Sequence, residues 1–185
     1  MIDDLIQDAV RRMDRSIETT HGEFNGVRTG RASAALLDRI QVDYYGQQTP
    51  LKQLATLNVP EPRMLTIQPF DPTSLKGIEK AIMESDLGLV PSNDGKIIRL
   101  PIPQLTEERR KELVKVVRHV AEEGRVAVRN VRRDVMHHLK ELVDSGKVGS
   151  DEEHRAEERV QKLTDEHVQK IDELLKKKEA EIMEV

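Results

Sequence analysis

The chain has 185 residues, of which 35% are charged and 2% are aromatic, and its formal net charge is −4. Two Tyr, two Phe and no Trp disfavour an aromatic-lined ligand pocket and base stacking along single-stranded nucleic acid. The sequence contains no Cys, which excludes disulfides and thiolate metal sites, and no apolar run approaches the roughly 20 residues that span a bilayer, so we expect a cytoplasmic protein without a membrane partner.

The N-terminal segment predicts a helix from about Asp3 to Arg28, because its apolar residues recur with a period near 3.5. Thr29 and Gly30 follow, and Gly30 is expected to end the helix in the left-handed conformation. The apolar stripe consists of Ile2, Ile6, Ala9, Met13, Ile17, Phe24 and Val27.

The middle of the chain has the pattern of a small α/β module. Short apolar runs predict strands at Ile40–Tyr44, Leu54–Val59, Met64–Ile67, Leu87–Val90 and Ile97–Leu100. Gly46 predicts a turn, and Asn93-Asp94-Gly95 predicts a hairpin turn. Asp71-Pro72 is typical of a helix start, and the helix is expected over Thr73–Ser85 with Leu75, Ile78 and Ile82 buried.

The C-terminal part predicts two long helices. The first begins after the N-cap candidate Thr106 and fades at Asp144-Ser145-Gly146. Its apolar seam consists of Val114, Val117, Ala121, Gly124, Val128, Val131, Val135, His138 and Leu142. The second begins at Ser150, which forms an S-x-x-E capping box with Glu153. Its stripe consists of Val160, Leu163, His167, Ile171, Leu174, Lys178 and Ile182.

Each long helix carries one apolar stripe and needs a partner that buries it. We therefore predict an α+β fold in which residues 1–29 and 106–185 form a long three-helix bundle and residues 30–105 form an inserted β/α/β domain. Glycine frees the backbone and proline stiffens it, so the two connections predict a restricted hinge. The hinge candidates are Gly30 in one connection and Pro101, Pro103, Gln104 and Leu105 in the other.

Catalytic motifs are absent from the sequence. It contains no P-loop and no G-x-G-x-x-G, G-x-S-x-G or H-E-x-x-H pattern. His137 and His138 cannot both face one metal from a regular helix, because neighbouring side chains diverge by about 100°. We predict no catalytic residue, no metal and no cofactor.

Positive charge is concentrated in one segment. Residues 109–133 contain nine Lys or Arg against three Asp or Glu, whereas residues 150–185 contain seven against twelve. On a helical projection with Val117 at 0°, four arginines fall between about 60° and 120°, in one line beside the seam. They are Arg118, Arg125, Arg129 and Arg132, and Arg133 adds a fifth nearby.

A guanidinium group suits phosphate because it presents a fixed pair of donors. The line of arginines therefore favours binding to the phosphates and 2′-hydroxyls of folded RNA. The alternative interpretation is that these arginines pair with acidic residues of the other helices.

Several stretches give the chain a specific resemblance. They are Val27–Ser33, Val42–Gly46, Thr49–Ala55, Lys80–Leu89, Leu105–Lys111, Arg125–Asp134, Gln161–Asp165 and Lys178–Glu181. With these stretches in this order, the chain closely resembles the bacterial ribosome recycling factor family over essentially its whole length.

The resemblance implies an L-shaped, tRNA-like molecule that binds the post-termination 70S ribosome, with its bundle on large-subunit ribosomal RNA. With elongation factor G and GTP, such a factor helps split the subunits and frees messenger and transfer RNA. It implies a monomer that is not an enzyme, because the hydrolysis belongs to elongation factor G. By position, the implied RNA-binding residues are Arg132 and Arg129 first, with Arg28 and Arg31 beside the hinge next.

Two alternatives remain open from the residues alone. One is a structural helical adaptor in which the arginines are paired within the molecule. The other is a hydrolase that acts through a carboxylate pair. Salt-dependent ribosome binding would distinguish a recycling factor from an adaptor, and activity without a ribosome or partner would indicate the hydrolase.

Overall fold

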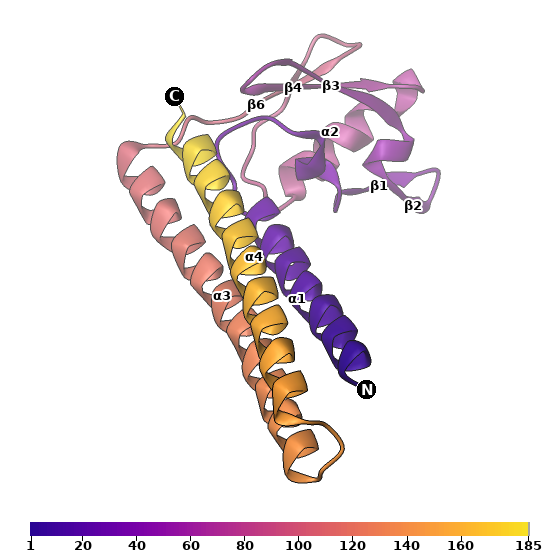
Figure 1. Cartoon of the computed structure of the whole chain (residues 1–185). Coiled ribbons are helices and arrows are strands. Elements are labelled where there is room, and N and C mark those ends of the chain that lie inside the picture. The colour runs from indigo at the N-terminus through magenta and orange to yellow at the C-terminus, as the bar shows by residue number, and fades with distance from the viewer. Residues whose placement is uncertain (185) are drawn as a thin grey trace. The chain divides into compact units, whose positions relative to one another are not determined.

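The computed structural model describes residues 1–184, and the chain divides into two compact units (Figure 1). Met1–Arg28 and Glu107–Val185 form the first unit, and Thr29–Thr106 form the second.

Three helices lying side by side make up the first unit (Figure 1). They are α1 (Ile2–Asn25), α3 (Glu107–Asp144) and α4 (Ser150–Met183). A short turn reverses the chain between α3 and α4, and Gly146 has φ +73° there. The Gly146 amide donates to the Val143 carbonyl and the Lys147 amide donates to that of Leu142, the pair of bonds that ends a helix at a left-handed glycine.

The bundle core follows the predicted seam in its middle. Six α3 residues of that seam are buried: Val117, Ala121, Gly124, Val128, Val131 and Val135. The prediction is wrong at both ends, where Leu113 and Leu139 are buried while Val114 is half-buried and His138 is exposed. An α-helix has 3.6 residues per turn, so a stripe followed in heptad steps drifts off the buried face within a few turns.

Two helix ends also differ from the predictions. Helix α1 ends at Asn25, three residues early, so Gly30 takes its left-handed φ of +78° outside the helix and does not cap it. Gly149, not Ser150, is the N-cap of α4, and no side chain caps it. The predicted capping box is therefore not formed.

The second unit contains two antiparallel sheets and one α-helix. The larger sheet has the order β3-β4-β6-β5, from Ala55–Glu61, Met64–Pro69, Ile98–Pro101 and Ser92–Asn93. A separate hairpin joins β1 (Gln41–Tyr44) to β2 (Gln47–Pro50). Helix α2 (Leu75–Glu84) buries Leu75, Ile78 and Ile82 as predicted, after a 3-10 turn at Pro72–Ser74 in which Asp71 accepts from the Thr73 amide.

One strand prediction in this unit is wrong, and one strand was not predicted. Leu87–Val90 is not a strand, because Gly88 has φ +66° and breaks the extended backbone, although Leu89 is still buried. The edge strand beside β6 is the two-residue β5 instead, and β4 pairs with the other side of β6. Strand β2 carries no apolar alternation and is paired through the tight turn at Tyr45 and Gly46, with φ +50° and +81°.

Both connecting segments are hydrogen-bonded to the same turn within this unit. The Ala32 amide donates to the Pro62 carbonyl and the Ile102 amide donates to the Arg63 carbonyl, each at 2.8 Å. Gly30 lies against Leu105, whose Cγ would be 3.2 Å from a β-carbon at position 30. Pro101 is part of β6, opposite Met64, and so belongs to the sheet.

Candidate nucleic-acid interface

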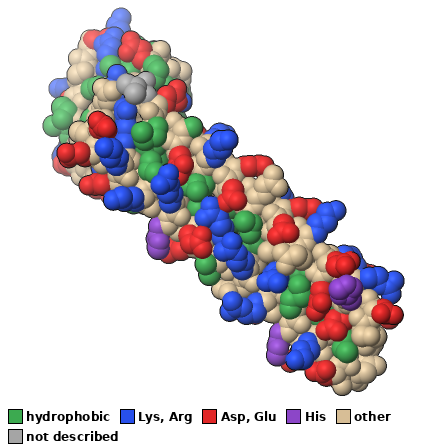
Figure 2. All heavy atoms as spheres, turned by 60° about the vertical axis from the view of Figure 1, so that its left-hand side comes forward, with side chains coloured by type: hydrophobic (Ala, Val, Ile, Leu, Met, Phe, Trp, Pro, Cys, Tyr) green, Lys and Arg blue, Asp and Glu red, His purple; other side chains and the backbone are tan. Residues whose placement is uncertain are grey.

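The predicted arginine line lies on α3, and the structure divides it into arginines that are paired across the bundle and arginines that are not. Figure 2, with the α3 side turned forward, shows Lys and Arg side chains adjoining one another along this face with acidic side chains among them. The neighbours of each arginine therefore decide what it can bind.

Arg118 and Arg125 are paired with α4. Arg118 Nε donates to Glu179 at 2.6 Å, and Arg125 donates to Asp172 from Nε at 2.7 Å and lies 2.6 Å from it through Nη2. Arg125 also donates to Glu122 at 3.1 Å. Partial burial would lower the pKa of Arg125, but the hydrogen bonds to Asp172 and Glu122 outweigh burial and raise it. Arg118 and Arg125 are thus paired within the molecule.

Arg129 is held only weakly. Its Nη1 lies 3.6 Å from Glu122, beyond hydrogen-bond distance, and its side chain is half exposed. An exposed ion pair of this kind contributes about 0–1 kcal/mol. Arg129 is thus close to an acid but has its donors available.

Arg132 and Arg133 have no ion pair with any residue in the part of the chain that the structure describes. The Arg132 Nε is buried without a hydrogen-bond partner, although the residue as a whole is partly exposed. A buried donor without an acceptor is unusual in a native protein. Arg133 is exposed and lies beside Asp134 in the sequence.

Two features near this face were missed by the sequence reasoning. Arg110 also has a buried Nε without a hydrogen-bond partner, and the charge count over residues 109–133 is the signal that included it. Arg12 of α1 donates to Asp134 at 2.7 Å, and this bond lowers the pKa of Asp134. No local sequence pattern indicates a pair between residues so far apart.

Arg28 and Arg31, the remaining arginine candidates, lie on the first connecting segment. Both are exposed, and both make interactions within the molecule. Arg28 belongs to the first unit and Arg31 to the second.

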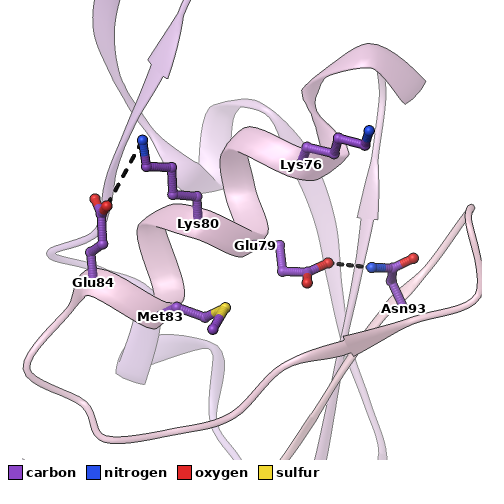
Figure 3. A pocket seen from close by; sticks show the side chains of 6 residues that line it. All are labelled: Lys76, Glu79, Lys80, Met83, Glu84 and Asn93. Carbon is purple, nitrogen blue, oxygen red and sulfur yellow. Dashed lines mark hydrogen bonds and ion pairs between the residues drawn. The ribbon is translucent and has the colours of Figure 1, made fainter.

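A shallow depression of ≈460 Å³ lies in the second unit between α2 and β5 (Figure 3). Lys76, Lys80, Glu79 and Glu84 line it, and Asn93 donates to Glu79 across it. Lys80 lies 3.9 Å from Glu84, and this mixture of charges does not resemble a catalytic constellation. Among residues 1–184 no group of three or more His, Asp or Glu could hold a metal, and no helix in that range is long and apolar enough to cross a membrane.

A family model and the similar curated proteins all point to one family. A family model described as "Ribosome recycling factor" matches residues 20–183. The chain is 59% identical to the ribosome-recycling factor of Rubrobacter xylanophilus over 97% of each chain, and 58% identical to that of Alkaliphilus metalliredigens over 94% of each. It is 51% identical to the factor of Geobacillus kaustophilus over the whole of both chains.

Two solved structures are similar over nearly the whole chain. One is a solution structure of a ribosome recycling factor, with a TM-score of 0.78, 44% identity and coverage of 100% of this chain and 98% of that one. The other represents the Thermus thermophilus factor with Escherichia coli elongation factor G bound to a post-termination complex, with a TM-score of 0.65, 48% identity and full coverage of both chains.

Proposed function

The chain belongs to the ribosome recycling factor family, and from that membership we propose how its residues serve ribosome recycling. It binds the post-termination ribosome and, with elongation factor G and GTP, promotes subunit splitting and release of mRNA and tRNA. The observation that carries this conclusion is an identity of 51% to 59% with ribosome-recycling factors along nearly the whole length of both chains.

The RNA-binding surface that we propose is the face of α3 around Arg132, Arg133 and Arg129. Support comes from the lack of an ion pair at Arg132 and Arg133 within residues 1–184 and from the exposure of Arg133 and Arg129. Arg28 and Arg31, on the first connecting segment, are further candidates for contact with ribosomal RNA. Arg118 and Arg125 contribute positive charge, but their guanidinium groups donate hydrogen bonds to acidic residues of α4.

A helical adaptor with a fully paired stripe is the less favoured function. Arg118 and Arg125 fit it, whereas Arg132 and Arg133 do not, and the relatives with this length and sequence are ribosome-recycling factors.

We also propose that the chain supplies no catalytic residue, that GTP hydrolysis belongs to elongation factor G, and that the factor works as a monomer in the cytoplasm. Residues 30–105 transmit the action of elongation factor G, and the connections at Gly30 and at Pro103, Gln104 and Leu105 act as the hinge, whereas Pro101 is held in β6.

The function as a whole is tested by polysome breakdown. Adding the chain together with elongation factor G and GTP is expected to convert polysomes to free subunits, and omitting either the chain or elongation factor G should prevent it. Polysomes that stay intact with all components present would contradict the assignment.

The RNA face is tested by comparing Arg132→Ala with Arg155→Ala. A charge-assisted hydrogen bond to phosphate contributes about 1.5–3 kcal/mol, so Arg132→Ala is expected to weaken ribosome binding about tenfold or more. Arg155 is exposed on α4, where its Nε donates to the Asp151 carbonyl, and its loss should leave binding unchanged. The measurement is a binding titration with 70S ribosomes after circular dichroism has confirmed the helix content. Equal affinities for the two variants would exclude this face.

A further inference from the structure

A chain of charged contacts runs from α4 across α3 and ends at the proposed RNA-binding face. Asp172 of α4 holds Arg125, Arg125 holds Glu122, and Glu122 lies beside Arg129. The contacts differ in strength, because the contact between Glu122 and Arg129 is the one of the three that lacks a hydrogen bond.

Arg125 is the fixed member of this chain. Its side chain is only 19% exposed, and its donors are directed at two carboxylates. A guanidinium so placed is a support within the bundle and has little left to offer a phosphate.

Glu122 is oriented by that support. Its Oε2 accepts from Arg125 at 3.1 Å, which leaves Oε1 directed at Arg129, 3.6 Å from Nη1. Both Glu122 and Arg129 are about half exposed, at 54% and 51%. A phosphate reaching Arg129 would form shorter, paired hydrogen bonds and would meet the Glu122 carboxylate as a like-charged neighbour.

We propose that Glu122 is a built-in competitor for Arg129, which lowers the affinity of the α3 face for the RNA phosphate backbone and keeps binding reversible. The proposal rests on the proposed RNA-binding function. A factor that must leave the ribosome after each round gains from an affinity that is limited in this way, because affinity differences at one interface reside mainly in the dissociation rate.

The test is Glu122→Gln, which removes the charge and keeps an acceptor for Arg125. Exposed ion pairs contribute little, so binding to 70S ribosomes at one fixed KCl concentration is expected to tighten by about twofold to fivefold. Glu123→Gln is the matched control, because Glu123 is the next residue on α3, is similarly exposed, and pairs with His119 at 3.0 Å instead of with an arginine. Glu123→Gln should leave the affinity close to that of the wild type.

A double-mutant comparison makes the assignment specific. In an Arg129→Ala background, Glu122→Gln should no longer tighten binding, because the competed group is gone. The proposal is overturned if Glu122→Gln and Glu123→Gln have equal effects, if Glu122→Gln weakens binding, or if the gain persists without Arg129. Wild-type affinity in both Arg129→Ala and Arg132→Ala would overturn the proposed RNA face itself, and the competitor with it.

Discussion

Asp14 and His167 join α1 to α4 through a contact that buries the imidazole almost completely. The ring nitrogens lie 2.6 Å from the Leu163 carbonyl oxygen and 2.8 Å from the Asp14 carboxylate, and the His167 side chain is only 4% exposed. A buried polar atom that loses its partner pays the desolvation penalty without compensation.

Asp14→Ala is therefore expected to lower the free energy of unfolding by about 1–3 kcal/mol. Asp8→Ala on the same helix is the control, because Asp8 forms an exposed pair with Arg11 and should contribute less than about 1 kcal/mol. Urea denaturation followed by circular dichroism measures both variants. Similar midpoints for the two would mean that the buried contact adds nothing.

Asp94 shapes the turn before β6. Its carboxylate accepts from the Ile97 amide at 2.9 Å and from the Lys96 amide at 3.0 Å, and it pairs with Arg99. These bonds lower the pKa of Asp94 from 3.8 to about 2, and the hydrogen bond from the Ile97 amide has the largest effect.

A lowered folded-state pKa means that this stabilisation is complete above about pH 4 and is lost as the pH falls toward 2. We expect the Asp94 carboxyl carbon to titrate near pH 2 by NMR, together with the Lys96 and Ile97 amide shifts. Asp94→Asn retains an acceptor oxygen but has no carboxyl group that titrates. The chemical shifts of the Lys96 and Ile97 amides should therefore lose this pH dependence in the variant. A titration midpoint near pH 3.8 in the wild type would show that the hydrogen bonds of the turn do not lower the pKa of Asp94.

At the scale of the elements, α1 and α3 approach closely at Gly124. A β-carbon at that position would collide with Thr20 Oγ1 of α1 and lie 3.2 Å from Ile171 Cδ1 of α4. Thr20 is itself buried, and its hydroxyl donates to the Ser16 carbonyl, so it has little freedom to move away.

Gly124→Ala should consequently destabilise the bundle by about 1–3 kcal/mol through overpacking, although alanine favours helices. Gly22→Ala in α1 is the control, because nothing lies within 4 Å of its added β-carbon, and it should stabilise by up to about 1 kcal/mol. Adding Thr20→Ala to Gly124→Ala should restore part of the loss. Thermal melting compares the four proteins, and a stabilised Gly124→Ala would show that the helices have room to separate.

The sequence predicts best the elements whose burial follows a simple period. The seam from Val117 to Val135 is such a case, because each of its residues faces the other two helices and the 3.6-residue repeat decides which they are. Strand β2 could not be found, because its partner residues and the Tyr45-Gly46 turn form it without apolar alternation. Leu87–Val90 looked like a strand because apolar packing and strand pairing give the same pattern.

The candidate site was predictable as a line of charge but not as a set of contacts. The helical projection placed the arginines on one face, whereas their partners are acids 47 and 61 residues further along the chain. Which arginines are used up by Asp172 and Glu179 depends on the register of α3 against α4, and no local pattern contains that information.

At the scale of the whole molecule, two short connections join the units, and Gly30 is the residue in them with a positive φ. Proline fixes φ near −65°, so it cannot adopt the +78° of this position. Any side chain there would also press on Leu105.

Gly30→Pro is expected to leave ribosome binding near normal and to reduce subunit splitting markedly, because it alters the connection and not the α3 face. Gly95→Pro replaces another positive-φ glycine of the same unit away from the connections, and it should split subunits at nearly the wild-type rate. A binding titration and a splitting assay on one preparation, after circular dichroism, decide the matter. Splitting by Gly30→Pro at the wild-type rate would exclude a hinge role for Gly30.

The contact between Gly30 and Leu105 has a consequence for the order in which the chain folds. Thr29–Thr106 is continuous in sequence and has a hydrophobic core of its own, so we expect it to fold before the bundle, in which α1 needs α3 and α4. Once that insert is folded, its two ends lie together, and the long loop between α1 and α3 behaves as a short one. Loop closure costs about 0.6 kcal/mol for each doubling of length, so prior folding of the insert lowers the entropic barrier to the bundle by on the order of 2 kcal/mol. The folded insert thus shortens the effective loop between α1 and α3, the helices that flank it, and so favours formation of the bundle.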